Sequence, residues 1–387
     1  MTAPNRDLKI AAVSAFDRLD GLLSPLRRAS APQMPPKRIL FWTVDRIGDV
    51  LRSSMALGTL ARAFPQAEIT AVIANRAGAV MQHSPHIHRY VAIPKPHDLK
   101  DHWAALRQLQ GQAYDLGVIA EVEPIWAKLG QLVFRRLGVS RWARFELGLA
   151  PHPREALVPL DPGKGWDLLF ADLAAALGAD TPPPRPELFL NPDDRSGAAQ
   201  ILTDHGIAPG QGYILCHPGT SALVIDRSWP AEKFGAVLAA LQSQTGLPAI
   251  ITGLPAEKPL AQAAIKAAGQ IFGSALPLDM TGKLSLGQLM AAIDGARLML
   301  VNDTGPMHIA NALSTPTVAI LGPTAPHVLG TDPSTTRLVH QALECQPCAF
   351  HGGLQACSNP VAYDCLKQVS IDQVTRAAQE LLEVGQP

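Results

Sequence analysis

The chain has 387 residues, with 33 Lys and Arg against 33 Asp and Glu, so its formal net charge is zero and its composition gives no support to nucleic-acid binding. Hydrophobic residues make up 47% and charged residues 17%, as in an ordered globular protein, and the length predicts two domains. The sequence has no run of about 18 apolar residues and no secretory signal at its start, so we expect a cytoplasmic protein.

Residues 1–36 form a distinct N-terminal extension. Before a group of prolines, apolar residues recur there at helical spacing: Leu8, Ala12, Phe16, Leu19, Leu23 and Leu26. An amphipathic helix is therefore expected. Two surfaces are open to its apolar face. One is a protein surface, in this chain or a partner, and the other is the membrane interface, where nearby basic residues would support a peripheral contact.

From Lys37 the chain alternates between strands and helices. Strands are expected at 38–44, 69–74, 89–93 and 116–120, and helices at 50–64, 75–83, 98–111, 124–137 and 165–177. This alternation predicts a parallel sheet with right-handed crossovers. The proline-dense stretch 181–194 is the best linker, and we place the first domain at 37–186.

A second alternation fills the C-terminal domain, 187–387. Strands are expected at 249–252, 298–301 and 317–321, and within 213–220, where a strand runs into a polar turn. Helices are expected at 256–268, 285–294, 306–313 and 371–382, with another ending near Gly246. Between 298 and 324 a polar turn joins a strand to a short helix, and ligands bind at the carboxyl edge of such a sheet. The N–H groups that open the helix favour an anion, although Asp303 or Thr304 could equally serve as a helix cap.

The same segment carries a resemblance to a known family. Residues 302–324, N-D-T-G-P-M-H-I-A-N-A-L-x-T-P-T-V-A-I-L-G-P-T, resemble the C-terminal signature of the bacterial heptosyltransferases, the family-9 glycosyltransferases that build the inner core of lipopolysaccharide. The resemblance implies the α/β architecture named GT-B, with two Rossmann-like domains whose parallel sheets face a central cleft. It also implies inverting transfer, without a metal cofactor, of heptose from ADP-heptose onto a lipopolysaccharide core acceptor.

The loop after the first strand, D-R-I-G-D (45–49), supplies the candidate catalytic residue. Its single glycine makes it no dinucleotide fingerprint, and from the residues alone Asp49 is most simply a helix N-cap. The resemblance implies instead that Asp49 is the general base, because inverting transfer needs a carboxylate to take the proton of the attacking hydroxyl. It also assigns acceptor binding, in the N-terminal domain, to Arg89 at the start of a strand.

The resemblance places the nucleotide-sugar donor in the C-terminal domain. The stretches H-P-G-T-S (217–221) and D-R-S-W-P (226–230) resemble the loops that hold the donor diphosphate. This likeness assigns diphosphate binding to Thr220, Ser221 and Arg227. Many members carry lysine where this chain has Arg227, and arginine can bind phosphate through two parallel hydrogen bonds, so the role survives the change.

Other donor-site positions come from the same resemblance. They are Glu257, Leu284, Asp303, Thr304, Gly305 and His308. Glu257 would contact the nucleoside and Leu284 the adenine, although by themselves they would be a first-turn helix acid and a core leucine. Asp303 would bind sugar hydroxyls, and the amides of the next two residues would meet the diphosphate. The side chain of His308 could face either the ligand or the sheet.

Four cysteines lie close together near the C-terminus: Cys345, Cys348, Cys357 and Cys365. The first two have the spacing of a zinc knuckle, and in a reducing compartment such a group suggests a structural zinc ion before disulfides. Free buried thiols are a third reading. No role in sugar transfer is implied.

Two rival functions remain open beside the heptosyltransferase reading. One is a GT-B transferase or sugar epimerase that uses another nucleotide sugar. The other is a catalytically silent nucleotide-binding scaffold. Binding of ADP rather than UDP and a turnover assay would separate the three.

Overall fold

The computed structural model describes residues 34–384 except 97, 221–227, 273–275, 351–352 and 355–356. The chain divides into two compact units, Met1–Phe189 and Leu190–Pro387, close to the boundary that we placed at 186 and 187. The expected N-terminal helix lies outside the described residues. Among the helices that the structure describes, none has the length and apolar character needed to cross a membrane.

Unit 1 is built on a six-stranded parallel sheet. Its strands are β1 (Arg38–Thr43), β2 (Glu68–Ala74), β3 (Arg89–Ile93), β4 (Leu116–Ile119), β5 (Arg141–Phe145) and β6 (Glu155–Val158). They lie in the order β3-β2-β1-β4-β5-β6, and every neighbouring pair is parallel. The long apolar runs of β1 and β2 are buried almost throughout, as expected for strands that are covered on both faces.

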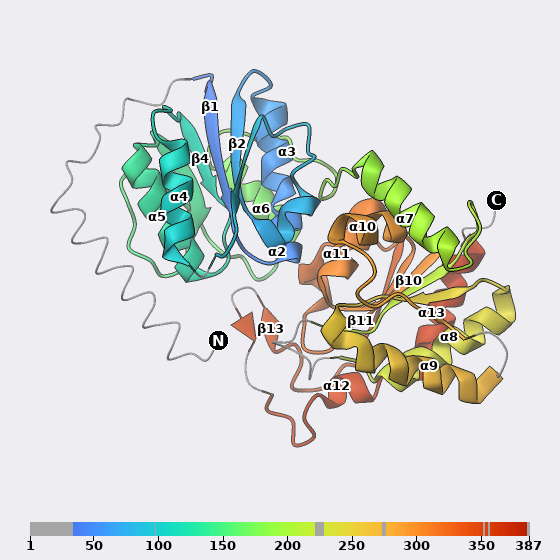
Figure 1. Cartoon of the computed structure of the whole chain (residues 1–387). Coiled ribbons are helices and arrows are strands. Elements are labelled where there is room, and N and C mark those ends of the chain that lie inside the picture. Colours follow the sequence, from blue (N-terminus) through green and yellow to red (C-terminus); the bar gives the residue numbers. More distant parts are fainter. Residues whose placement is uncertain are drawn as a thin grey trace. The chain divides into compact units, whose positions relative to one another are not determined.

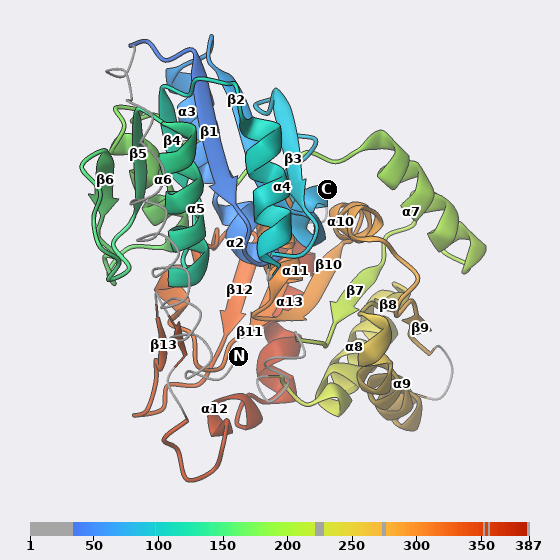
Figure 2. The ribbon, with the colours of Figure 1, turned by 60° about the vertical axis from the view of Figure 1, so that its left-hand side comes forward.

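Helices cover both faces of this sheet. They are α2 (Ile47–Arg52), α3 (Ser54–Ala63), α4 (Leu99–Leu109), α5 (Pro124–Leu137) and α6 (Trp166–Ala175), with the 3₁₀ turn η1 (Asn75–Val80). Figure 2 shows α4 and α5 on one face and α3 and α6 on the other. Helix α5 starts at Pro124 and ends at Gly138, whose φ of 72° stops the helix in the left-handed conformation.

Unit 2 repeats the plan of unit 1. Its main strands are β7 (Ile214–His217), β8 (Ala249–Ile251), β9 (Leu278–Asp279), β10 (Leu298–Asn302), β11 (Thr317–Ile320) and β12 (Thr336–Val339). They form a second parallel sheet in the order β12-β11-β10-β7-β8-β9. Both sheets therefore have the 3-2-1-4-5-6 order of the doubly wound fold.

The helices of unit 2 also lie on both faces of its sheet (Figure 1). They are α7 (Pro192–Asp204), α8 (Ala231–Thr245), α9 (Lys258–Phe272), α10 (Leu286–Asp294), α11 (Gly305–Leu313), α12 (Asp364–Lys367) and α13 (Ile371–Val384), with 3₁₀ turns η3 (Pro255–Glu257) and η4 (Pro326–Leu329). A small antiparallel hairpin, β13 (Ala349–Phe350) and β14 (Gly353–Leu354), precedes α12. The core between the sheet and α8, α9 and α13 is centred on Trp229, Phe234 and Leu300.

Several expectations need correction. The helix expected at 50–64 is two helices, and the first begins at Ile47, so Asp49 lies in the first turn of α2 rather than in a loop. The strands β5, β6, β9 and β12 and the helix α7 were not expected. Part of the expected linker belongs to folded structure, because the side chain of Asn191 accepts a hydrogen bond from the amide of Asp193 and caps α7.

Candidate active site

Each sheet has one place where ligands are expected. In a doubly wound sheet the chain leaves the two central strands in opposite directions, and the crevice between their carboxyl ends is the usual binding site. In unit 1 these strands are β1 and β4, and in unit 2 they are β7 and β10. Functional residues are therefore expected at the carboxyl ends of these two strand pairs.

Asp49 lies after β1, at the switch point of unit 1. It is the third residue of α2, whose N-cap position is taken by Arg46, so Asp49 is not the N-cap. Its side chain is buried between two cations. Arg52 Nη2 lies 2.8 Å from Asp49 Oδ1, and Arg46 Nε lies 3.4 Å from Asp49 Oδ2. Both oxygens are thus held in a fixed direction at the carboxyl edge.

Asp45 and Glu121 extend this site with two further buried carboxyl groups. Glu121 follows β4, is fully buried, and accepts a hydrogen bond from the amide of Val44 through Oε1. Oδ2 of Asp45 and Oε2 of Glu121 accept no hydrogen bond from the described residues. Glu121 was not among the expected site residues, although the acidic E-V-E stretch directly after a strand was an available signal.

Burial and mutual repulsion make these acids hard to ionise. Burial, together with the charge of Asp49, raises the pKa of Asp45 to about 7. Burial and the charge of Asp45 raise the pKa of Glu121 well above its usual range. The site therefore combines the carboxyl group of Asp49, which is paired with two arginines, and two buried acids whose pKa values are raised.

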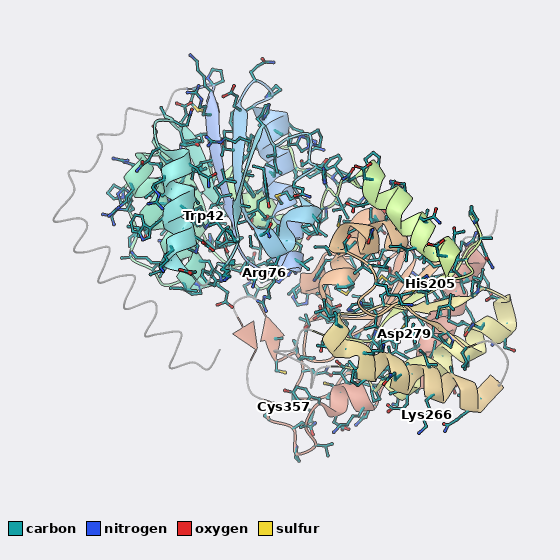
Figure 3. The ribbon with its side chains drawn as sticks, viewed as in Figure 1. Trp42, Arg76, His205, Lys266, Asp279 and Cys357 are labelled. Carbon is teal, nitrogen blue, oxygen red and sulfur yellow. The ribbon has the colours of Figure 1, made fainter. Side chains whose placement is uncertain are left out.

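Two arginines of unit 1 have different positions relative to this cluster. Arg76, in η1, has an exposed side chain and donates from Nε to the backbone oxygen of Asp45 over 3.4 Å (Figure 3). Arg89 lies at the first residue of β3, and so at the amino edge of the sheet, where its Nη2 donates to the backbone oxygen of Gln108. The structure does not bring Arg89 together with Asp49, and its acceptor-binding role stays a prediction.

In unit 2 a buried amide joins the loops of the two central strands. Asn302, the last residue of β10, accepts from the amide of Trp229 at 3.0 Å through Oδ1 and donates to the carbonyl of Pro218 at 2.8 Å through Nδ2. The loop after β7 is thereby held against the N-D-T-G turn. Asn302 belongs to the motif seen in the sequence, but only the residues after it were expected to bind the donor.

The N-D-T-G turn opens α11. Asp303 Oδ2 accepts a hydrogen bond of 2.5 Å from Thr324 Oγ1, which comes from the loop after β11. Thr304 is the N-cap residue, but its hydroxyl donates to the carbonyl of Asn302 and makes no side-chain cap bond. Helix α11 then starts at Gly305 with Pro306 in its first turn, and His308 is buried one turn along. The turn thus offers one carboxylate and the start of one helix.

The loop after β7 is only partly described. Thr220 is buried and its Oγ1 lies 2.9 Å from the hydroxyl of Ser228. Ser221 and Arg227 lie outside the described residues, so their donor-binding roles stay predictions. Thr220 does lie at the switch point, two residues beyond the Pro218 carbonyl that Asn302 binds.

Glu257 lies beside this loop. Its Oε2 accepts from the amide of Leu254 at 2.7 Å and is 3.8 Å from Nε2 of His217, and a Cβ on Gly219 would overlap its carboxylate. Burial lowers the pKa of His217 to about 4 and raises the pKa of Glu257, so the histidine is neutral at pH 7. The contact between them is therefore between a neutral imidazole and an acid, and does not act as an ion pair.

Leu284 belongs to the next loop along the sheet. It is half-buried and follows Gly282, whose φ is +74° and whose amide donates to the carbonyl of Gly253 at 2.8 Å. The loops after β8 and β9 are thus bonded to each other at the carboxyl edge. The loops after β9, β8, β7 and β10 together bring the predicted donor residues that are described to one edge of unit 2.

The four cysteines of the expected zinc site are all among the described residues. Cys345, Cys348 and Cys357 lie outside helices and strands and Cys365 lies in α12, and they form no group of side chains able to hold a metal ion. The structure therefore gives the zinc site no support, and it stays a prediction.

Comparison with known proteins shows which family the chain resembles. Residues 166–353 match the model of glycosyltransferase family 9 (heptosyltransferase). Over these residues the chain is similar to the heptosyltransferases of that family. Lipopolysaccharide heptosyltransferase 3 of Escherichia coli is 24% identical over 284 residues, which are 72% of this chain and 81% of the relative. Lipopolysaccharide heptosyltransferase 1 of Pseudomonas aeruginosa is 25% identical over 330 residues, 80% of this chain and 86% of the relative.

Solved structures of the family share the fold. The glycosyl transferase family 9 structure from Veillonella parvula matches with a TM-score of 0.74 at 21% identity, covering 90% of this chain and 98% of that chain. The E. coli ADP-heptose lipopolysaccharide heptosyltransferase II matches with a TM-score of 0.69 at 16% identity, covering 90% and 99%. The predicted fold class, α/β with the GT-B plan of two Rossmann-like units, is confirmed, and so is the expectation of a family-9 glycosyltransferase.

Proposed function

We propose that this glycosyltransferase moves a heptose from ADP-heptose onto a lipopolysaccharide core acceptor with inversion at the anomeric carbon. The relatives named above are lipopolysaccharide heptosyltransferases. One related E. coli heptosyltransferase was solved with ADP-2-deoxy-2-fluoro heptose, which supports an ADP-linked donor. The acceptor is a glycolipid, and we place the enzyme at the cytoplasmic face of the inner membrane, in peripheral contact with it.

The observation that carries the mechanism is the buried carboxylate of Asp49 at the switch point of unit 1. In the proposed step the acceptor hydroxyl gives its proton to Asp49 as its oxygen attacks the anomeric carbon. The bond from that carbon to the diphosphate breaks, and ADP leaves with the electron pair. Arg46 and Arg52 keep the base oriented. A positioned base of this kind contributes about 10² to 10⁴ in rate.

Unit 2 would hold the donor. The carboxylate of Asp303 would accept hydrogen bonds from sugar hydroxyls, and the start of α11 at Thr304 and Gly305 would face the diphosphate. Arg227 with Thr220 and Ser221 would neutralise the phosphates. Glu257 would bind the nucleoside, and the partly exposed Leu284 would pack on the adenine. His308 is assigned to the same site, and Arg89 to the acceptor.

The test is a turnover assay with purified protein, ADP-heptose and lipopolysaccharide core that lacks the heptose. We expect release of ADP and a product with inverted anomeric configuration in its NMR spectrum. Turnover of UDP-sugars with none of ADP-heptose would favour another GT-B reaction. Tight ADP binding without turnover of any donor would favour a silent scaffold.

A further inference from the structure

Helix α5 of unit 1 is apolar on the side that faces away from the sheet. Its inner side is marked by Gly130, where a Cβ would lie 3.0 Å from Ile119 in β4. At 100° per residue the opposite, outer side carries Ile125, Lys128, Leu129 and Leu132. A helix on the surface of an α/β unit normally has polar residues there, so this outer side is unusual.

The outer side of α5 is also closed to solvent. Ile125, Lys128, Leu129 and Leu132 each expose only 4% to 7% of their surface. Lysine is rarely buried to this extent, and Lys128 Nζ donates to Oε1 of Gln131 at 2.8 Å instead of reaching water. Burial of this kind requires a segment of chain that lies over the outer side.

The described neighbours of α5 account for its inner side and its two flanks. Helix α4 packs beside it (Figure 2), and the guanidinium of Arg136 lies 4.5 Å from the centre of the Trp103 ring of α4. On the other flank, Gln131 Nε2 donates to the carbonyl of Ala150, in the loop after β5, at 3.1 Å. A cover for the outer side is therefore sought in the rest of unit 1, which includes the N-terminal extension.

The N-terminal extension has the pattern that such a cover needs. Its apolar residues recur at helical spacing between 8 and 26, with Leu19 at the centre of the apolar side. A helix over this range would be about 28 Å long, and the 14 residues of α5 span about 21 Å. One helix is thus long enough to cover the other from end to end.

The chain enters unit 1 beside the end of α5. The amide of Lys37 donates to Oδ2 of Asp115, just before β4, at 2.8 Å. The amide of Ser140, just after α5, donates to the carbonyl of the neighbouring Tyr114 at 3.1 Å. Residues 27–33 span at most about 25 Å, so a helix that ends at 26 stays within reach of α5.

We propose that residues 8–26 form a helix whose apolar side packs along the outer side of α5 in the same chain. The sequence pattern alone would also suit a membrane interface or the α5 helix of a second copy. Attachment next to α5 decides for the same chain, because a tethered segment has a high effective concentration there. In this state the apolar side of the extension is not available to lipid, so any membrane contact must use another surface.

Photocrosslinking in the full chain tests the contact directly. Phe16, on the apolar side, is replaced by p-benzoylphenylalanine, and the matched control places the same group at Asp17, on the opposite side of the helix. Irradiation should link position 16, but not position 17, to the tryptic peptide 129–135 of α5. In a mixture of isotope-labelled and unlabelled protein the linked peptides should carry a single label. Mixed labels would show a second copy, and they, a link elsewhere or the same link from position 17 would overturn the proposal.

Acetylation of Lys128, followed by mass spectrometry, gives a second readout in the full chain. Leu19→Asp places a charge in the apolar contact and should speed acetylation of Lys128 about tenfold or more, whereas Ser14→Asp, the same change on the polar side, should leave it as in wild type. The exposed Lys100 of α4 serves as the internal reference. An unchanged rate in Leu19→Asp would overturn the proposal. So would a wild-type Lys128 that is protected only when vesicles of phosphatidylglycerol and phosphatidylethanolamine are added, because the membrane would then be the cover. The crosslinking result does not depend on how Leu19→Asp folds.

Discussion

Replacing Asp49 by asparagine separates a base from a structural acid. Asparagine keeps the shape and one acceptor oxygen but cannot take the proton, so we expect turnover to fall by about 10² to 10⁴. The variant also loses the negative charge whose two oxygens lie 2.8 Å from Arg52 Nη2 and 3.4 Å from Arg46 Nε. Donor affinity should stay near that of wild type, because the donor residues belong to unit 2.

The stability change can be sized from the same contacts. A hydrogen bond to a charged group contributes about 1.5–3 kcal/mol, and a neutral one about half as much. Since asparagine still offers Arg52 an acceptor oxygen but no longer the opposite charge, the free energy of unfolding should fall by about 1 to 1.5 kcal/mol. For a unit of this size that corresponds to a Tm lower by about 2 to 6 °C. An effect of this size cannot by itself remove activity at 25 °C.

Arg52→Gln is the matched control. It breaks the same buried ion pair from the other side and should destabilise at least as much, but it leaves the carboxylate of Asp49 in place. Both variants would be compared with wild type by ADP release at saturating donor and acceptor, well below their melting temperatures. If Asp49 serves only to hold α2 in place, the two variants should lose activity equally. Turnover of Asp49→Asn within tenfold of Arg52→Gln would refute the base assignment.

Three other changes probe the rest of the two sites. Asp303→Ala should weaken ADP-heptose binding about tenfold to a hundredfold in calorimetry, the effect of losing about 1.5–3 kcal/mol, and wild-type affinity would contradict the donor assignment. Asn302→Leu leaves two buried backbone groups without partners and should lower the free energy of unfolding by about 2 to 5 kcal/mol in urea, whereas a loss below about 1 kcal/mol would contradict its bridging role. Asp45 has a folded pKa of about 7 against a usual 3.8, so the folded protein holds a proton that the unfolded chain gives up, and wild-type stability falls as pH rises from about 4 to 7. The free energy of unfolding of Asp45→Asn, relative to that of wild type, should therefore rise by about 1 to 4 kcal/mol between pH 4 and 8. A difference that does not change with pH would exclude this titration of Asp45.

The sequence predicted the parts of the fold whose apolar runs are uninterrupted. The strands β1, β2, β10 and β11 and the helix α5 lie where periodicity placed them to within about two residues. β5 was missed because the run R-W-A-R-F contains two arginines. In the structure Arg144 is fully buried and paired with Glu155 of β6 over 2.9 Å, so a charge that argues against a buried strand is neutralised by the next strand.

Helix α7 and strand β9 were not predicted from the sequence for other reasons. Only Ala198 and Leu202 of α7 are buried, so that helix has little apolar periodicity, and β9 has two residues. In the site, the turn at 302–305 could be named from one continuous motif. The long-range contacts of the two sites could not be predicted in this way, since Pro218 is 84 positions from Asn302 in unit 2 and Val44 is 77 positions from Glu121 in unit 1. Those neighbours follow from strand order, which periodicity alone does not give.

The strand order has a consequence for synthesis on the ribosome. The first strand of each unit, β1 or β7, becomes a central strand, and its second neighbour emerges much later: Ile39 pairs with Leu116, and Ile214 with Leu298. Until then an apolar edge stays open, and such pairings between distant residues form slowly. Because all of unit 1 precedes unit 2, its sheet can close before β7 is made. The nascent chain then carries only one incomplete sheet at a time, which limits the exposure of unpaired apolar strand edges during synthesis.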